Sequence, residues 1–215
     1  MSSPLPKSLY WVRTDTVGAD HALVDDRRGL HARGTALAAD PVPYTCRYDL
    51  LVDEAWATVR LEVTCEGAGW LRSLRLERAA GRWRASTAEQ GDLDAALTAA
   101  GRPGAGLPGT DDPDRLSAAL DVDLSAAPLF NVLPVRRFGL SGAAPGSSYP
   151  IEVVWVLVPS LAVVPVEQVY TVLDGGDVRF DSVGFTADLI LDRDGYVTHY
   201  PGLAERAGVT GPPPV

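Results

Sequence analysis

Short stretches in which apolar and polar side chains alternate constrain the fold more than any other feature of this chain. Residues 56–64 show the pattern most clearly, with apolar residues at alternate positions between polar or amphipathic neighbours. A period of two marks a β-strand that has one buried face. Asp53 and Glu54 form a polar turn just before this stretch, and the DGGD sequence at residues 174–177 is typical of a β-hairpin. The chain is therefore expected to fold as strands joined by tight turns.

The strand pattern recurs along most of the chain and predicts the fold class. Because the connections are mostly hairpins, neighbouring strands should run antiparallel. A sheet with so many strands curls rather than staying flat. We predict an all-β protein, in which residues 1–215 form a single domain built as one large antiparallel β-roll. This roll is a curled, barrel-like sheet of about a dozen or more strands, with at most one or two short helices. The expected strands lie at residues 8–13, 17–26, 30–37, 44–52, 56–64, 70–77, 82–85, 151–158, 161–173, 178–182, 185–191 and 196–200.

Two segments depart from the strand pattern. Residues 86–115 are rich in Ala, Gly, Pro and Asp, which predicts a long loop or insertion. Within it, Asp92 to Ala100 is compatible with one short helix, with Asp92 as the N-cap and Gly101 at the C-terminal end. The tail at residues 209–215 ends in three prolines and a valine and is expected to be frayed.

The charge balance excludes some partners. The chain has 19 basic and 28 acidic residues and a net charge of −9. A protein that binds nucleic acid without regard to sequence needs a basic surface to displace counterions, and adsorption to anionic lipids needs one as well. We therefore expect neither nucleic acid nor an anionic membrane surface to be a partner.

The most apolar run of the chain, VVWVLVPSLAVVPV at residues 153–166, is not typical of a membrane-spanning segment. It is too short, it contains Pro159 and Pro165, and it lies between Glu152 and Glu167. A buried hairpin that turns after Pro159 is expected instead, and no membrane insertion is predicted.

The N-terminal sequence and the cysteines predict a cytoplasmic protein. The first residues, MSSPLPKSLYW, contain no apolar segment of the kind found in signal peptides. Cys46 and Cys65 should lie near each other on adjacent strands, so a disulfide between them is one alternative. A reducing compartment favours the other, two free thiols.

No cofactor or metal site is predicted. The chain has no C-x-x-C pair, and Asp192 and Asp194 resemble the start of a calcium loop without its later ligands. His21, His31 and His199 are interpreted as strand residues, although His199 could serve as a base.

The segment DVDLSAAPLFNVLPVRRFGL carries the main candidate site. It combines Asp121, Asp123, Asn131, Arg136 and Arg137 with apolar residues that leave no obvious solvent face. We interpret the two arginines as successive strand residues, which point to opposite faces. An inward guanidinium needs an anionic partner, because a lone buried charge is costly. Two alternatives are open: an ion pair with Asp121 or Asp123, or a bound ligand.

The same segment resembles the signature of a bacterial family labelled "putative glycolipid-binding", formerly a family of unknown function. The resemblance spans nearly the whole chain, although Phe130 and Val132 stand where the family usually has threonines. Further matching motifs are Asp53 with Trp56, the tripeptide Gly81, Arg82 and Trp83, Pro159 with Leu161, Gln168 with Tyr170, the alternating Phe185, Ala187 and Leu189, and Asp192 with Gly195, Val197, Tyr200, Pro201 and Gly202.

The resemblance implies a spiral β-roll that holds a glycolipid or another amphiphile on its concave face. Tyrosine side chains suit such a ligand, because each has an apolar body and a polar end. The residues expected to bind the ligand are Asp121, Asp123, Asn131, Arg136, Arg137, Gln168, Tyr170 and Tyr200.

Two other functions remain open from the sequence. Exposed edge strands could pair with other chains, which would make the protein an oligomer or interaction module with a solid core. Asp121 and Asp123 could also form the acid and base of a hydrolase, since alternate strand residues share a face and crowding raises a carboxyl pKa. The chain lacks the G-x-S-x-G motif of serine hydrolases, and we lean towards a protein that is not an enzyme.

Overall fold

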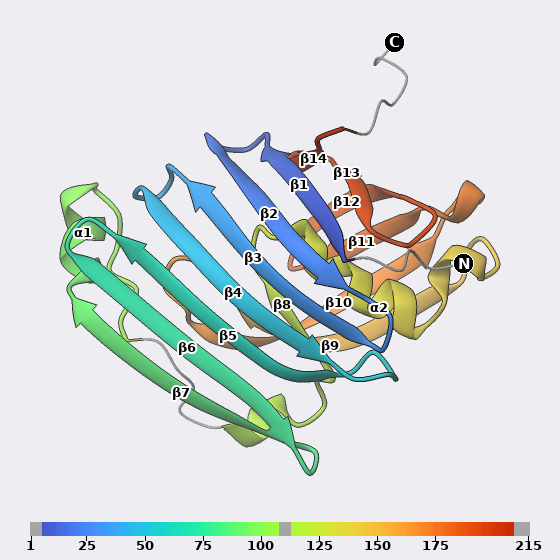
Figure 1. Ribbon diagram of the computed structural model, residues 1–215, viewed down its shortest axis with the longest axis horizontal. Coiled ribbons are helices and arrows are strands. Elements are labelled where there is room, and N and C mark those ends of the chain that lie inside the picture. The colour runs from blue at the N-terminus through green and yellow to red at the C-terminus, as the bar shows by residue number, and fades with distance from the viewer. Residues whose placement is uncertain (1–5, 108–112, 209–215) are drawn as a thin grey trace.

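A computed structural model describes residues 6–107 and 113–208 of the chain, so the predicted frayed tail at 209–215 lies outside the described residues. The described residues form one 14-stranded sheet in the order β7-β6-β5-β4-β3-β2-β1-β14-β13-β12-β11-β10-β9-β8 (Figure 1). The strands are β1 (Lys7–Arg13), β2 (Gly18–Asp25), β3 (Leu30–Ala38), β4 (Tyr44–Val52), β5 (Thr58–Gly67), β6 (Trp70–Ala79), β7 (Arg82–Gly91), β8 (Asp121–Leu124), β9 (Ser148–Val156), β10 (Val163–Val172), β11 (Val178–Ser182), β12 (Phe185–Leu191), β13 (Val197–Tyr200) and β14 (Ala204–Arg206). The predicted fold class, a curled and mostly antiparallel sheet, is confirmed.

One strand pair departs from the antiparallel prediction. β8 pairs with β9 in parallel, with Asp121 opposite Val153 and Asp123 opposite Trp155. Parallel neighbours need a long crossover instead of a hairpin, and the chain between β8 and β9 supplies one. This crossover contains the 3₁₀ turn η2 (Pro128–Asn131) and the helix α2 (Val132–Arg137).

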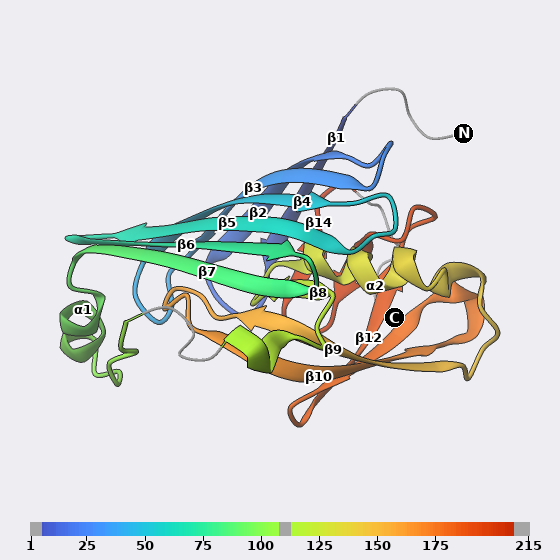
Figure 2. The same cartoon turned by 90° about the horizontal axis from the view of Figure 1, so that it is seen from below.

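The sheet forms a spiral because its last strands lie under its first ones (Figure 2). Val122 and Val154, on the outer side of β8 and β9, belong to the same buried core as Leu61 and Leu74 of β5 and β6. The backbone amide of Thr58 also donates to Leu120, just before β8, at 3.0 Å. One face of β8 and β9 therefore packs against β5 and β6, and the other face points into the roll.

The predicted strand at the two arginines is wrong, because Arg136 and Arg137 lie in α2. This helix occupies the interior of the roll, between the β1–β5 side and β9 (Figure 2). Leu133 is fully buried and Val135 is 1% exposed. The first four residues of α2, Val132 to Val135, are all apolar and buried, as expected of a segment that fills a core. The helix ends before Gly139, which has φ 62°, a left-handed conformation that glycine adopts without strain.

The predicted loop at 86–115 is wrong at its start. Strand β7 extends to Gly91, but residues 86–91 include no large apolar side chain, so they lack the apolar alternation that signals a strand. The predicted helix is confirmed as α1 (Leu93–Ala99), and the Asp92 carboxylate caps it by accepting from the Ala95 amide at 2.8 Å.

The cysteines and the apolar run lie where the pairing pattern predicted them. Cys46 and Cys65 face each other across β4 and β5 as buried free thiols. Their mutual hydrogen bond and burial raise the pKa of Cys46. β9 and β10 form the expected hairpin at Pro159. Within the described residues, no helix has the length and apolar character needed to cross a membrane.

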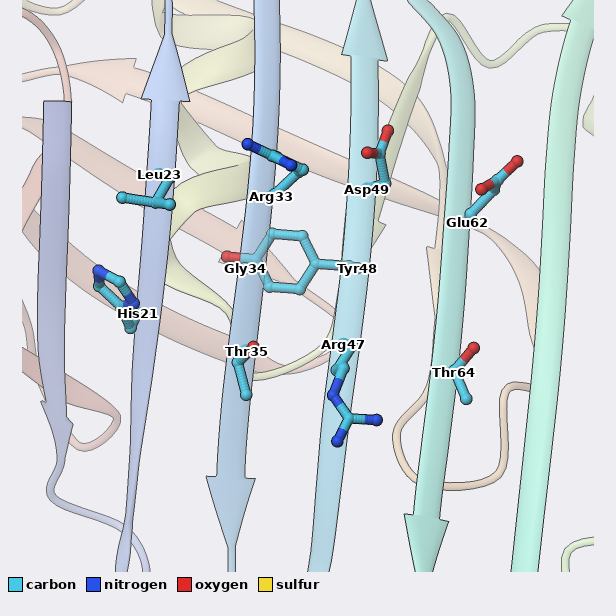
Figure 3. Close-up of a pocket in the computed structure, with 10 residues that line it drawn as sticks. All are labelled: His21, Leu23, Arg33, Gly34, Thr35, Arg47, Tyr48, Asp49, Glu62 and Thr64. Carbon is cyan, nitrogen blue, oxygen red and sulfur yellow. The ribbon is translucent and has the colours of Figure 1, made fainter. Parts of the chain in front are cut away.

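Replacing Gly34 with alanine should destabilise the protein by about 1–3 kcal/mol. Gly34 of β3 lies opposite Tyr48 of β4, and a Cβ atom there would overlap the Tyr48 ring (Figure 3). Tyr48 cannot move freely, because it packs edge-on against Phe130 of η2, with ring centroids 5.4 Å apart. Gly142→Ala is the matched control, since its added Cβ meets no atom within 4 Å. Urea unfolding of both variants measures the difference, and equal midpoints would contradict the prediction.

Candidate functional site

A cavity of about 360 Å³ lies on the inner face of the roll. β8 to β13 each contribute to it, together with η2 and three connecting turns. The lining residues are Asp123, Leu124, Ser125, Ala126, Ala127, Asn131, Trp155, Gln168, Phe180, Ser182, Val183, Phe185, Tyr200, Gly202 and Leu203.

A second hollow, of about 450 Å³, lies on the outer face of β2–β5 (Figure 3). It is more open to solvent than the inner cavity, and most of its charged side chains already have partners. Asp49, for example, lies 3.3 Å from both His31 and Arg60. We therefore take the inner cavity as the candidate functional site, and we attribute the outer charges to cross-strand pairing of the sheet surface.

The floor of the inner cavity is a connected set of polar side chains. Asp123 Oδ2 accepts from Gln168 Nε2 at 2.6 Å. Tyr170 Oη lies 3.0 Å from Asn131 Oδ1 and 3.4 Å from Gln168 Oε1, so its single proton can serve either amide oxygen. Asn131 donates to the Pro128 carbonyl at 3.3 Å. Strand β8, the crossover and strand β10 thus hold the floor from three directions.

Several polar groups of the cavity are uncommitted. Within the described part of the chain, neither Asp123 Oδ1 nor Tyr200 Oη takes part in a hydrogen bond. Gln168 Nε2 and Asn131 Nδ2 each carry a second N–H that none of the described contacts uses. The cavity can therefore offer a carboxylate acceptor, amide donors and a phenol that acts as either.

Burial tunes the charge of this site. Desolvation raises the pKa of Asp123 to about 6, although the hydrogen bond from Gln168 opposes the shift. Burial, with a smaller contribution from the Asp123 charge, raises the pKa of Tyr200 as well. At pH 8 the cavity therefore contains one carboxylate and a neutral tyrosine. No lysine, arginine or histidine is among the described residues that line it.

Aromatic side chains form the walls above the polar floor. Phe180, Phe185 and Tyr200 are in mutual contact, with all three pairs of ring centroids between 6.2 and 6.3 Å apart. Trp155 of β9 lies directly across from Asp123 in the parallel pair. The walls are thus apolar surfaces next to hydrogen-bonding atoms, as in small-molecule sites generally.

The predicted site residues separate into two groups. Asp123, Asn131, Gln168 and Tyr200 line the cavity, and Tyr170 stands behind the two amides. The others do not line it: they are Asp121, Arg136 and Arg137.

Both arginines are held by carboxylates of the protein itself. Arg137 pairs with Asp121 at 2.8 and 2.6 Å, and the carboxyl group is buried beneath α2. Arg136 lies 3.3 Å from Asp26 and stacks over Trp56 at 5.3 Å. Of the two alternatives for the arginines, the structure has the ion pair with Asp121, and Asp26 was not foreseen as a partner.

The hydrolase hypothesis finds little support in this geometry. Asp121 and Asp123 share the inner face of β8, but only Asp123 reaches the cavity. A pair of carboxyls that acts on one substrate must have both members within reach of it. Among the described residues, no group of three or more potential metal ligands comes together.

Sequence reasoning missed the apolar part of the cavity. Trp155, Phe180 and Val183 sit in stretches that read simply as strand or turn, and nothing in their spacing relates them to Asp123. The register of β8 against β9, and of β10 against β11, brings them together. Phe185 was noted only as part of a family motif.

Comparisons with known proteins agree with the fold. A crystal structure of a DUF1089 family protein from Pseudomonas aeruginosa is similar, with a TM-score of 0.66 and 23% identity, covering 90% of this chain and 94% of that chain. No curated protein matches the sequence. Residues 8–206 match the family described as "Putative glycolipid-binding". The chain therefore belongs to this family, as the separated motifs predicted.

Proposed function

We propose that the protein binds the neutral, polyhydroxylated head group of an amphiphile, such as a glycolipid, in the inner cavity. The observation that carries the proposal is the makeup of the cavity: one carboxylate, two amides and a free phenol next to aromatic walls, without a cationic side chain among its described residues. The family description points to the same class of ligand.

Sugar hydroxyls match these groups because each hydroxyl both donates and accepts. Asp123 Oδ1 would accept from one hydroxyl, and the spare N–H groups of Gln168 and Asn131 would donate to others. The apolar face of a sugar ring would rest on the aromatic side chains. An anionic head group would meet the Asp123 carboxylate without a compensating cation, which disfavours phosphate and sulfate.

The volume restricts the ligand to one small head group. About 360 Å³ is near the lower end of the roughly 300–1,000 Å³ of small-molecule sites. A whole lipid with two acyl chains would not be enclosed. A cavity of this size also favours ligand binding over the alternative of a solid, purely interacting roll. Self-association and a cytoplasmic location remain predictions.

Replacing Asp123 with asparagine should weaken binding of n-octyl β-glucoside about tenfold or more, because a hydrogen bond to a charged group contributes about 1.5–3 kcal/mol. Titration calorimetry below the micellar concentration measures the loss. In the wild-type protein, affinity should fall as pH drops through about 6, where Asp123 becomes protonated. Asp188→Asn is the control, because Asp188 is an exposed carboxylate paired with Arg179 at 2.7 Å, remote from the cavity lining.

Three amphiphiles with one tail test the head-group class. n-Octyl β-glucoside should bind, whereas n-octyl sulfate should not. Tighter binding of octyltrimethylammonium would contradict the proposal, because the aromatic walls and Asp123 would then be acting as a cage for a cation. The proposal would also be contradicted if none of the three probes bound to the wild type or to Asp188→Asn while both proteins were folded.

A further inference from the structure

The turn between β11 and β12 carries a residue that the turn itself does not favour. Ser182 pairs with Phe185, so Val183 and Gly184 form a two-residue hairpin loop, with φ angles of 46° and 77°. Loops of this kind, with positive φ at both positions, favour Asn, Asp or Gly at the first one. A β-branched residue at positive φ is an outlier, because its side chain crowds the backbone.

Val183 gains no burial that would explain its presence. Its side chain is 76% exposed, and Phe185 next to it is 45% exposed. Both residues nevertheless line the cavity. Ala126, on the turn after β8, has φ 65° and lines the same cavity. Strained backbone that packing does not account for is typical of functional sites.

The cavity also has a polarity gradient. Its polar floor is deep, since Gln168 is 3% exposed and Asn131 is 7% exposed. The most exposed of its large side chains, Val183 and Phe185, are apolar. A ligand with a polar head and an apolar tail fits this gradient in one orientation, with the head on the floor and the tail leaving past the exposed residues.

We propose that Val183 and Phe185 form a subsite for the first methylenes of a single alkyl chain, which leaves the cavity over the β11–β12 hairpin. This inference rests on the proposed function, since it assigns the tail of the same amphiphile. Each methylene that the subsite covers raises affinity about fourfold. The strained valine is retained at the turn because its apolar side chain contacts the ligand.

Val183→Asn tests the subsite, because asparagine is favoured at this turn position and should make the protein more stable. We expect the melting temperature to rise by about 2–4 °C. Affinity for n-octyl β-glucoside should fall about fourfold, which corresponds to losing one covered methylene. Affinity for methyl β-glucoside, which has no tail, should stay unchanged when followed by protein NMR shifts.

Val17→Asn is the matched control. Val17 is 84% exposed in the connection between β1 and β2, and it does not line this cavity. Val17→Asn should therefore leave the affinities for methyl β-glucoside and n-octyl β-glucoside unchanged. In the wild type, hexyl β-glucoside should bind between the methyl and octyl compounds.

The outcomes separate the two proposals. If Val183→Asn binds the octyl compound as well as the wild type does while Asp123→Asn does not, the subsite is wrong and the head-group site stands. If Val183→Asn loses methyl glucoside equally, the residue shapes the head site and the subsite is again wrong. If the wild type binds none of the glucosides, the proposed function fails and the subsite fails with it.

Discussion

Replacing Arg137 with methionine is expected to lower the free energy of unfolding by about 3–5 kcal/mol. Arg137 is the ion-pair partner of Asp121, with N–O distances of 2.8 and 2.6 Å. Asp121 is 1% exposed, so the variant leaves a carboxylate buried without its counter-ion. The loss of such a partner costs far more than the loss of an exposed one.

The cost of this substitution should depend on pH. In the wild type, burial raises the pKa of Asp121 while the Arg137 guanidinium opposes the shift. Without the guanidinium the pKa rises further, so Asp121 can avoid an uncompensated charge only by holding a proton. Urea unfolding should therefore show a larger loss at pH 8 than at pH 5.5.

Two further variants isolate the buried pair. In Arg136→Met, Asp26 keeps Lys7 at 2.6 Å and the Tyr196 hydroxyl at 3.0 Å, so the loss should be about 1 kcal/mol. Combining Asp121→Asn with Arg137→Met removes both charges and should recover part of the stability. Equal losses in the two arginine variants would show that the Asp121 pair does not stabilise the roll.

The protein is expected to be less stable at pH 8 than at pH 5. Asp20 is fully buried, and desolvation raises its pKa to about 7 against the bonding of Tyr48 Oη at 3.2 Å. Between about pH 4 and 7 the native protein holds this proton and the unfolded chain does not. Stability then falls with rising pH by up to 1.36 kcal/mol per unit, or about 4 kcal/mol across the window.

Asp20→Asn should remove the part of this dependence that Asp20 contributes, about 4 kcal/mol between pH 4 and 7. The amide mimics the protonated carboxyl, so the variant should match the wild type within about 1 kcal/mol at pH 5 and exceed it at pH 8. Asp121, with a pKa of about 7, and Asp123, with a pKa of about 6, add slopes of the same sign in both proteins. Urea unfolding at the two pH values measures the difference, and parallel pH profiles for variant and wild type would refute the assignment to Asp20.

Strands and turns could be predicted from the sequence because their signals are local. Alternation over residues 44–52 reports one buried face, and the predicted bounds match β4 (Tyr44–Val52). The N-cap at Asp92 is equally local, since it depends on residues three positions apart. β7 beyond residue 85 could not be predicted because it has no large apolar residue, and its pairing with β6 rather than its own pattern makes it a strand.

The interior of the roll could not be predicted in the same way. The sequence of α2 was interpreted as a strand. It is a helix because the crossover from β8 to β9 must fill the space between two parts of one sheet. Five of the eight proposed site residues do meet, around Asp123, whereas Arg136 and Arg137 are directed by the helix to Asp26 and Asp121.

The sequence by itself therefore determined the class of fold, most strand positions, the family and the polar residues worth testing. Only the tertiary structure decided which of these residues share a cavity, and it added the aromatic walls and the strained Val183. The physical reason is the distance along the chain over which each interaction acts. Alternation and turn chemistry act over a few neighbouring residues, whereas strand register and the curl of the sheet bring Asp123, Gln168 and Tyr200 together across large distances in the chain.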